Sequence, residues 1–184
     1  MKRIVDLILL LIALVFLAIP MLITAIIVKL TSPGPIVFWS DRVGQYNRIF
    51  RMPKFRTMQV NTPNVATHLL VGAGSYLTPV GGFLRKSSLD ELPQLFNVLK
   101  GEMSLVGPRP IVKAELERYG DDVQYFLMVR PGMTGLWQVS GRNDMDYDKR
   151  VYLDTWYVKN WSLWYDLVIL FKTVNVVLNR HGAY

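Results

Sequence analysis

The chain begins with one long apolar segment, and the remainder alternates shorter apolar runs with polar loops. Residues 7–28 contain no charged side chain. As an α-helix this segment would be about 33 Å long, which is enough to cross the hydrocarbon core of a bilayer. It is too long for the apolar part of a cleaved signal peptide, and no A-x-A-like cleavage site follows it. The pattern therefore predicts a membrane helix within residues 1–30.

Two features favour a re-entrant helix over a single-pass anchor. Pro20 lies in the middle of the segment, where it removes a backbone hydrogen bond and favours a break, although spanning helices tolerate proline. Basic residues flank both ends of the segment: Lys2, Arg3, Lys29, Arg42, Arg48 and Arg51. Positive flanks stay on the cytoplasmic side, so a helix that breaks near Pro20 and returns to the same face satisfies both. We predict this form, and the single-pass anchor is the alternative.

The pattern over residues 31–184 predicts a mainly helical α+β domain. Ile36–Trp39 and Arg48–Met52 are expected to form a small β-hairpin around the polar residues 40–47. Ser88–Lys100 is expected to be one amphipathic helix that stops at Gly101. Its apolar positions follow i, i+3, i+4, i+7 spacing: Leu92, Leu95, Phe96 and Leu99. Residues 59–82 are rich in Asn, Thr, Gly and Pro and are expected to form a loop.

Further helices are predicted at residues 111–119, 121–129 and 147–158. Residues 161–178 form the last predicted helix, which is apolar and aromatic but is interrupted by Asp166 and Lys172. Tryptophan and tyrosine are the residue types that lie at the level of lipid headgroups. We therefore expect a helix that lies on the membrane surface, with a buried core helix as the alternative.

Composition narrows the classes of function. The 184 residues are 51% hydrophobic, which excludes a fully disordered chain, and they include no cysteine, which excludes disulfide scaffolds and Cys-based zinc sites. The two histidines, His68 and His181, are far apart in the sequence, so a bound metal would be a hard ion held by oxygen. The net charge of +7 favours polyanionic partners such as nucleic acid, anionic lipid or phosphorylated substrates.

Asp90 and Glu91 follow two cations, Arg85 and Lys86, at the start of the helix predicted for residues 88–100. A structural explanation is that Ser88 and Glu91 form a capping box, or that Asp90 is the N-cap. A functional explanation uses the same geometry. The helix N-terminus and neighbouring cations would keep Asp90 ionised as a nucleophile toward phosphorus, and Glu91 would hold Mg²⁺. The motif alone leaves both explanations open.

Several further cations lie in loop-like settings beside proline or glycine, where the chain is stiff. They are Lys54, Arg56, Arg109, Arg130 and Arg142. Arginine held on a rigid turn suits bidentate recognition of phosphate. Any single one could equally be a solvated surface charge, but together they favour a phosphate-binding site.

These motifs resemble a known family, the bacterial monotopic phosphoglycosyl transferases. The resemblance lies in Lys54–Met58, Arg85–Gly101, Val106–Pro110 and Arg130–Gly135, in the same order. The C-terminal part from Gly135 is similar to the branch that moves hexose 1-phosphate, galactose or glucose. Members of that branch often carry extra N-terminal helices and a further domain, so this chain is expected to correspond to the catalytic unit.

The resemblance implies transfer of a phosphosugar from a UDP-sugar to polyprenyl (undecaprenyl) phosphate, with release of UMP. The implied route is ping-pong through a phosphosugar on the aspartate of the Asp-Glu pair, with Mg²⁺. Asp90 is then the nucleophile and Glu91 the metal ligand. The residues implied in phosphate and substrate binding are Arg85, Arg109, Arg142, Lys54 and, less directly, Asp154.

The expected organisation is a re-entrant helix at 1–30 and a membrane-associated catalytic domain at 31–184. That domain would lie on the cytoplasmic face of the bacterial inner membrane and act in surface polysaccharide synthesis. A membrane-tethered nucleic-acid binder and a membrane scaffold are the competing functions. The spread of the cations among loops argues against the first, so we expect no nucleic-acid partner. The exact sugar, the lipid length and a homodimeric state are left open.

Overall fold

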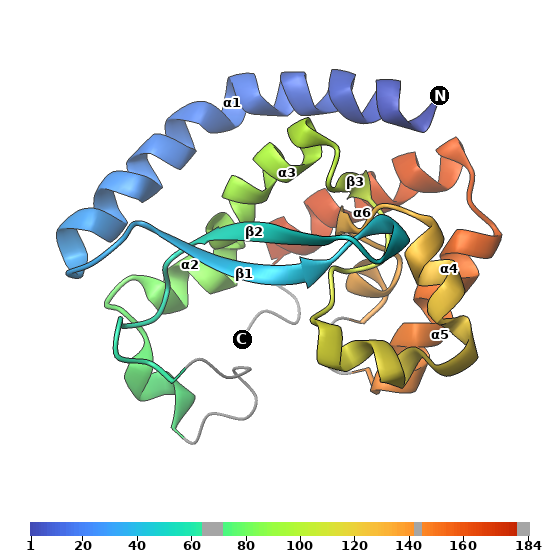
Figure 1. The fold of residues 1–184 in the computed structure, drawn as a ribbon. Helices are drawn as coiled ribbons and strands as arrows, with labels where there is room; N and C mark the ends of the chain where they lie inside the picture. The colour runs from blue at the N-terminus through green and yellow to red at the C-terminus, as the bar shows by residue number, and fades with distance from the viewer. Residues whose placement is uncertain (64–71, 142–144, 180–184) are drawn as a thin grey trace.

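The computed structural model describes residues 1–63, 72–141 and 145–179. Its first element, α1 (Lys2–Thr31), is a continuous helix that contains Pro20. Figure 1 shows that α1 bends as it passes over the rest of the domain. The break predicted at Pro20 therefore takes the form of a bend inside one helix. Within the described residues, α1 is the one helix whose length and composition would allow it to cross a membrane.

Only one face of α1 packs against the domain. Asp6, Leu10, Thr24 and Val28 are buried, which places contacts near both ends of the helix. Large apolar side chains on the other face are exposed, including Val15, Phe16, Ile19, Leu22 and Ile23. The helix thus covers the domain with a narrow stripe and presents a broad apolar surface outward.

The predicted hairpin is confirmed, with longer strands than expected. β1 (Val37–Val43) pairs antiparallel with β2 (Ile49–Phe55), and a short 3₁₀ turn, η1 (Gln45–Asn47), joins them. β2 extends to Phe55, which pairs with Val37 of β1. Phe50 and Met52 are buried in alternation, whereas Pro53 and Phe55 are buried on the opposite face of the strand, so the end of β2 is covered on both faces.

The segment predicted as one helix over residues 88–100 is divided into two elements, and a separate helix precedes them. α2 (Gly81–Ser87) ends at Ser88, which has a left-handed φ of 57°. A 3₁₀ segment, η4 (Leu89–Gln94), follows, and α3 (Leu95–Lys100) continues to Gly101, whose φ of 84° ends the helix as expected. The expected inward face was wrong in part: Leu95 is buried, but Phe96 and Leu99 are 49% and 45% exposed.

A second sheet was not predicted. β3 (Ser104–Val106) pairs parallel with β4 (Gly132–Thr134), and these short strands bring two glycine-containing motifs together. A Cβ on Gly132 would lie 2.1 Å from the backbone nitrogen of Gly107. Glycine is therefore required here so that the two backbones can approach, and the loop that carries Arg109 is fixed as a result.

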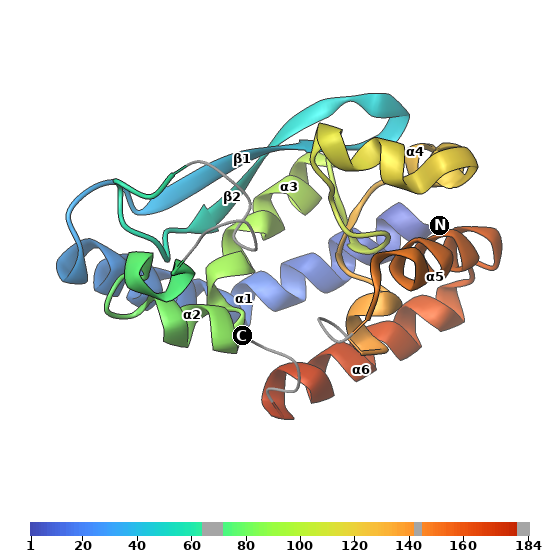
Figure 2. The ribbon, with the colours of Figure 1, turned by 90° about the horizontal axis from the view of Figure 1, so that it is seen from below.

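The remaining elements surround these two sheets (Figures 1 and 2). A 3₁₀ turn, η3 (Ala73–Tyr76), lies within the predicted 59–82 loop, of which residues 64–71 are outside the described chain. The expected helices at 111–119 and 121–129 correspond to the 3₁₀ segment η5 (Lys113–Asp122) and α4 (Val123–Met128). The last elements are η6 (Trp137–Val139), α5 (Tyr147–Lys159) and α6 (Leu163–Asn179).

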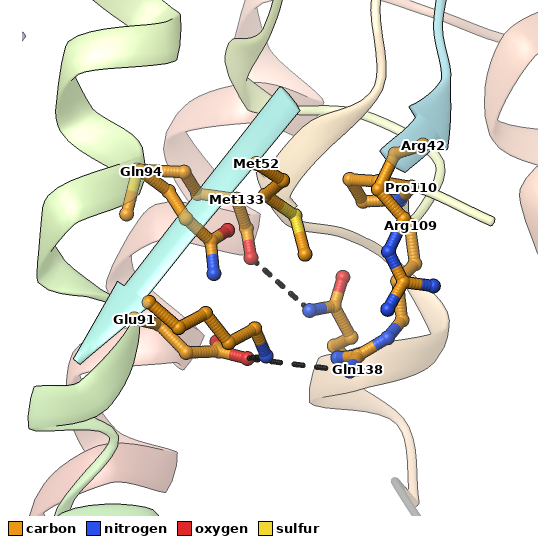
Figure 3. Close-up of a pocket in the computed structure, with 9 residues that line it drawn as sticks. Arg42, Met52, Glu91, Gln94, Arg109, Pro110, Met133 and Gln138 are labelled. Atoms are coloured by element: carbon orange, nitrogen blue, oxygen red, sulfur yellow. Dashed lines mark hydrogen bonds and ion pairs between the residues drawn. The ribbon is translucent and has the colours of Figure 1, made fainter. Parts of the chain in front are cut away.

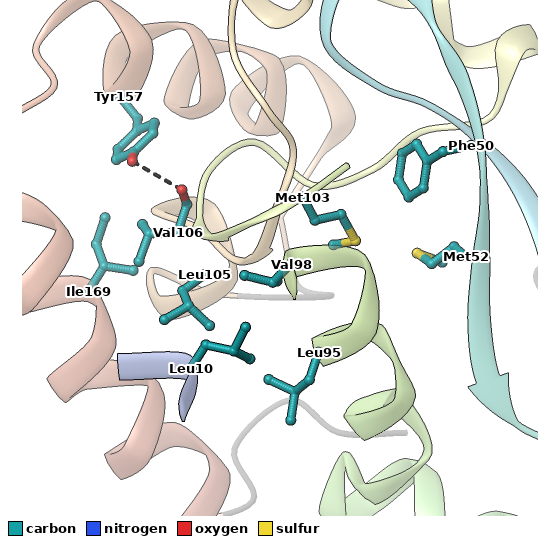
Figure 4. Close-up of a cluster of buried hydrophobic side chains, with 10 residues drawn as sticks. All are labelled: Leu10, Phe50, Met52, Leu95, Val98, Met103, Leu105, Val106, Tyr157 and Ile169. Carbon is teal, nitrogen blue, oxygen red and sulfur yellow. Dashed lines mark hydrogen bonds between the residues drawn. The ribbon is translucent and has the colours of Figure 1, made fainter. Parts of the chain in front are cut away.

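The main core joins elements from both ends of the chain, as Figure 4 shows. Its buried members include Leu10, Phe50, Leu95, Leu105, Tyr157 and Ile169. α6 contributes Ile169 to this core while Trp164 and Phe171 on its other side are 72% and 79% exposed. This core holds β2, β3 and α3 in fixed positions. The site lies on β2, on η4 just before α3, and on the loop after β3.

Candidate functional site

The acidic pair lies at a sharp change of backbone direction. Ser88 adopts a left-handed conformation between α2 and η4, and Asp90 and Glu91 occupy the first turn of η4. The side chain of Ser88 makes no capping hydrogen bond, so the expected capping box does not form. Asp90 is only 7% exposed. The structural explanation of this motif as a helix cap is therefore not supported by its geometry.

Three predicted cations converge on the acidic pair from different elements. Lys54 of β2 places its Nζ 2.6 Å from Glu91 Oε1, and Arg109 places Nη2 4.0 Å from the same oxygen. Arg85 of α2 donates from Nε to the Thr57 hydroxyl at 2.9 Å. The structure thus brings Lys54, Arg85 and Arg109 together around Asp90 and Glu91, as the motifs suggested.

Asp90 is expected to be ionised at neutral pH, and its burial works against this charge without removing it. Burial, followed by repulsion from Glu91, raises the pKa of Asp90 to about 6 against the opposing effects of Lys54 and Arg85. A carboxyl group with a pKa near 6 is still mostly ionised at pH 7, by about ten to one. The charge is present at neutral pH, but the protein destabilises it rather than stabilises it. Such a carboxylate is well suited to react.

The sequence interpretation missed three polar residues of the pocket beside the pair. Figure 3 shows this pocket, whose polar lining comprises Arg42, Lys54, Glu91, Gln94, Arg109 and Gln138. Arg42 had been noted only as a basic residue that follows the membrane segment. Burial, and then the charge of Arg109, lowers the pKa of Arg42. Two guanidinium groups that share a partly buried pocket favour an anionic ligand there.

Two predicted residues lie away from the pocket. Arg56 is 5% exposed and donates to the carbonyl of Pro35 and to Ser32, so it fixes the exit from α1 instead of lining the pocket. Asp154 is 2% exposed on α5 and accepts a hydrogen bond from the Tyr119 hydroxyl at 2.9 Å. Arg142 lies outside the described residues.

Asp154 acts from beneath the pocket. It receives a backbone hydrogen bond from Arg109, and burial raises its pKa to about 7. This contact can hold the Arg109 loop in place, whereas a buried acid is not suited to contact a phosphate directly.

The described residues contain no group of three or more His, Asp or Glu side chains that could enclose a metal ion. Mg²⁺ does not need such a cage, because it is commonly bound by one or two carboxylates together with substrate phosphates. Glu91 offers a half-buried carboxylate at the edge of a basic pocket. The donor chemistry therefore fits a magnesium ion that enters with a phosphorylated substrate.

The chain is similar to known proteins over most of its length. Residues 1–180 match the family described as bacterial sugar transferase. The undecaprenyl-phosphate galactose phosphotransferase of Salmonella typhimurium is 58% identical over 166 residues, which cover 82% of this chain and 35% of that protein. The UDP-galactose-lipid carrier transferase of Erwinia amylovora is 51% identical over 187 residues, which cover 94% and 39%.

A shorter relative matches over most of both chains. The exopolysaccharide production protein ExoY of Sinorhizobium fredii is 43% identical over 198 residues, which cover 100% of this chain and 88% of that protein. By contrast, this chain spans little more than a third of the Salmonella and Erwinia relatives.

Proposed function

Because the chain belongs to the bacterial sugar transferase family, we propose that it transfers a hexose 1-phosphate from UDP-galactose or UDP-glucose to polyprenyl phosphate. UMP is the second product. The names of the Salmonella and Erwinia relatives support galactose as the sugar and a lipid carrier as the acceptor. The reaction would be the first membrane step in the synthesis of a surface polysaccharide or glycoconjugate.

The observation that carries this proposal is the position of Asp90. Its carboxylate is buried, has a raised pKa, and lies next to Glu91 and within the field of Lys54 and Arg85. In the first step an Asp90 oxygen attacks the phosphorus that carries the hexose. The bond from this phosphorus to the bridging oxygen breaks, and UMP leaves with that oxygen.

In the second step a phosphate oxygen of the polyprenyl acceptor attacks the same phosphorus. The acyl phosphate bond breaks and the Asp90 carboxylate is regenerated. Lys54 and Arg109 lie where they can offset the charge of the phosphate oxygens during both steps. Because UMP leaves before the lipid reacts, the two large substrates need not occupy the pocket together.

Magnesium is part of this proposal. Glu91 would hold the ion, which would supply charge neutralisation for the phosphate oxygens of the donor. Lys54 contacts Glu91 Oε1 in the structure without substrate. It could therefore turn from Glu91 toward a phosphate oxygen when the donor binds.

The proposed location is the cytoplasmic face of the bacterial inner membrane, with α1 re-entrant. Arg3 near the start of α1 donates to the Val98 and Leu99 carbonyls at 2.6 and 3.0 Å. Just beyond its other end, the Ser32 carbonyl and hydroxyl accept from Arg56 at 2.9 and 2.8 Å. Contacts from both ends to one domain favour a helix that enters and leaves by the same face. Exposed apolar residues of α1 and α6 would contact lipid.

The test is to mix the purified protein with UDP-galactose or UDP-glucose and Mg²⁺ in the absence of lipid acceptor. We expect about one UMP per protein and an increase in protein mass equal to one hexose phosphate, located on Asp90 by peptide mapping. Added polyprenyl phosphate should remove this mass and start repeated turnover. Turnover in which the adduct never forms, even when acceptor is limiting, would contradict the covalent route.

A further inference from the structure

One wall of the pocket carries a carboxamide whose hydrogen-bonding capacity is not used. Gln94 ends η4 and lies three residues after Glu91, so in a 3₁₀ segment the two side chains project on the same side. Gln94 is 3% exposed, and its Nε2 is buried without a hydrogen-bond partner in the described part of the chain. A buried amide donor in this state has lost its hydration without gaining a partner, which destabilises the protein.

The other wall of the pocket carries a second carboxamide, in which the oxygen rather than the nitrogen lacks a hydrogen-bond partner. Gln138 of η6 donates from Nε2 to the Met133 carbonyl at 3.1 Å. A carbonyl can only accept, so this bond defines the orientation of the amide and directs Oε1 away from Met133. Oε1 of Gln138 is buried and also has no partner within the described residues.

Figure 3 shows Gln94 and Gln138 on opposite sides of the same pocket, next to Glu91 and the arginines. One offers an unused donor and the other an unused acceptor. A phosphate oxygen at neutral pH has little hydrogen to donate, so it would suit Arg42 and Lys54 but would oppose Gln138 Oε1. A hydroxyl group accepts and donates through the same oxygen, and it would satisfy both carboxamides at once.

We propose that Gln94 and Gln138 together bind one hydroxyl group of the donor hexose. The inference rests on the proposed function, because it assumes that the donor is a UDP-hexose. Gln94 lies one turn after Asp90 on the same segment, so the sugar would remain held while its phosphate is attached to Asp90. A site that hydrogen-bonds a hydroxyl discriminates against sugars in which that hydroxyl is missing or inverted.

The test measures binding of UDP-galactose, UDP-glucose and UDP to the Asp90→Asn protein, in which turnover is blocked. Gln138→Leu and Gln94→Leu are each added, with Gln124→Leu as the control because Gln124 is exposed on α4. We expect the preferred UDP-hexose to bind about tenfold more weakly to either pocket variant. UDP, which lacks the sugar, should bind equally to all of these proteins.

Donor analogues give a second measurement that does not depend on the folding of a variant. UDP-hexoses that each lack one hydroxyl are titrated into the protein with both glutamines intact. One of them should bind about tenfold more weakly, and this difference should disappear in Gln138→Leu. If no single hydroxyl matters, or if UDP binding falls as much as UDP-hexose binding in a variant that melts normally, the inference is wrong.

The proposed function and this inference fail in different ways. If the unmodified protein releases no UMP from any UDP-hexose, the proposed function fails. If it releases UMP but the glutamine variants and the deoxy analogues bind like their controls, only the hydroxyl site fails. That result would mean that water alone occupies the space between the two amides.

Discussion

Two polar clusters of this protein, each containing a buried aspartate, differ in how completely their hydrogen bonds are satisfied. The N-terminal clamp consists of Lys2, Tyr157, Trp161 and Asp166. Lys2 Nζ lies 2.5 Å from Asp166 Oδ2, the Tyr157 hydroxyl donates to Oδ1 at 2.6 Å, and Trp161 Nε1 donates to Oδ2 at 3.0 Å. Both oxygens of this 4% exposed aspartate therefore have partners from other segments. The clamp has the properties of a structural joint.

The pocket beside Asp90 shows the opposite pattern. Arg42 lies near Arg109, a group of the same charge, and Gln94 and Gln138 have buried atoms without partners among the described residues. Burial costs the clamp little because Lys2 pairs with Asp166 and both carboxylate oxygens accept hydrogen bonds, whereas the pocket contains buried amide atoms that have no partner among the described residues. The comparison indicates that the clamp serves the fold and that the pocket serves a ligand.

The largest effect is expected from Asp90→Asn. Loss of the nucleophile should abolish UMP release, while UDP-hexose should still bind because the cations remain. Asp90 is buried beside Glu91, so removal of its charge should leave the melting temperature unchanged or raise it. UMP assays, donor titration and thermal melting measure these three properties.

Asp148→Asn is the matched control, since Asp148 is exposed at the start of α5. It should behave like the unmodified protein in all three assays. Normal UMP release from Asp90→Asn would overturn the assignment of the nucleophile. A large fall in its melting temperature would show that the Asp90 region is a structural joint like the clamp.

Removal of the aspartate of the clamp should lower stability and leave donor binding intact. Asp166→Ala leaves Lys2, Tyr157 and Trp161 without their common acceptor, and we expect the free energy of unfolding to fall by about 3 kcal/mol. The pocket itself is unchanged, so donor binding to the folded protein should be retained below the new melting temperature. Denaturant unfolding and UDP-hexose titration separate the two effects.

An exposed ion pair supplies the control for this change. Lys159 Nζ lies 3.7 Å from Asp122 Oδ1, and the two side chains are 47% and 40% exposed. Asp122→Ala should therefore alter stability by less than about 0.5 kcal/mol. Equal effects of Asp122→Ala and Asp166→Ala would mean that the clamp contributes no more than a surface pair.

Local sequence patterns predicted the elements that depend on local chemistry. Strand-forming runs around a polar turn predicted the hairpin, and the segments that form α5 and α6 were predicted as helices. Arg85 adjoins the acidic pair in the sequence, whereas the association of Lys54 and Arg109 with that pair was an expectation from the family resemblance. The pairing of β3 with β4 was missed because three-residue strands have no visible period and their partners are distant in the sequence. Gln138 was missed for a related reason, since a single glutamine in a loop carries no signal until its neighbours are known.

The helix predicted at 88–100 shows a different limit. Apolar periodicity predicts an amphipathic helix with one apolar face. Phe96 and Leu99 belong to that face, yet both are largely exposed on α3. In a protein that contacts lipid, apolar side chains can face either the core or the membrane, and periodicity does not distinguish them. The left-handed Ser88 was equally invisible, because tertiary packing decides that conformation.

A smaller effect than those of Asp90→Asn and Asp166→Ala is expected from Arg42→Met, which changes a residue of the pocket. Methionine keeps much of the length and apolar contact of the arginine but removes its charge. Burial, Arg109 and Arg150 disfavour the charge of Arg42, and Glu115 and Glu91 favour it, so stability should stay nearly constant. UDP-hexose and UDP should both bind about tenfold more weakly, because the lost contact is to phosphate rather than to sugar.

Arg48→Met provides the reference, as Arg48 is exposed at the hairpin turn. If Arg42→Met lowers stability as a clamp residue would and leaves UDP binding unchanged, Arg42 belongs to the fold and not to the site. If it weakens UDP-hexose alone, the sugar lies nearer to the arginines than to the two glutamines. Weaker binding of both ligands without loss of stability is the result expected if Arg42 contacts the phosphates of the donor.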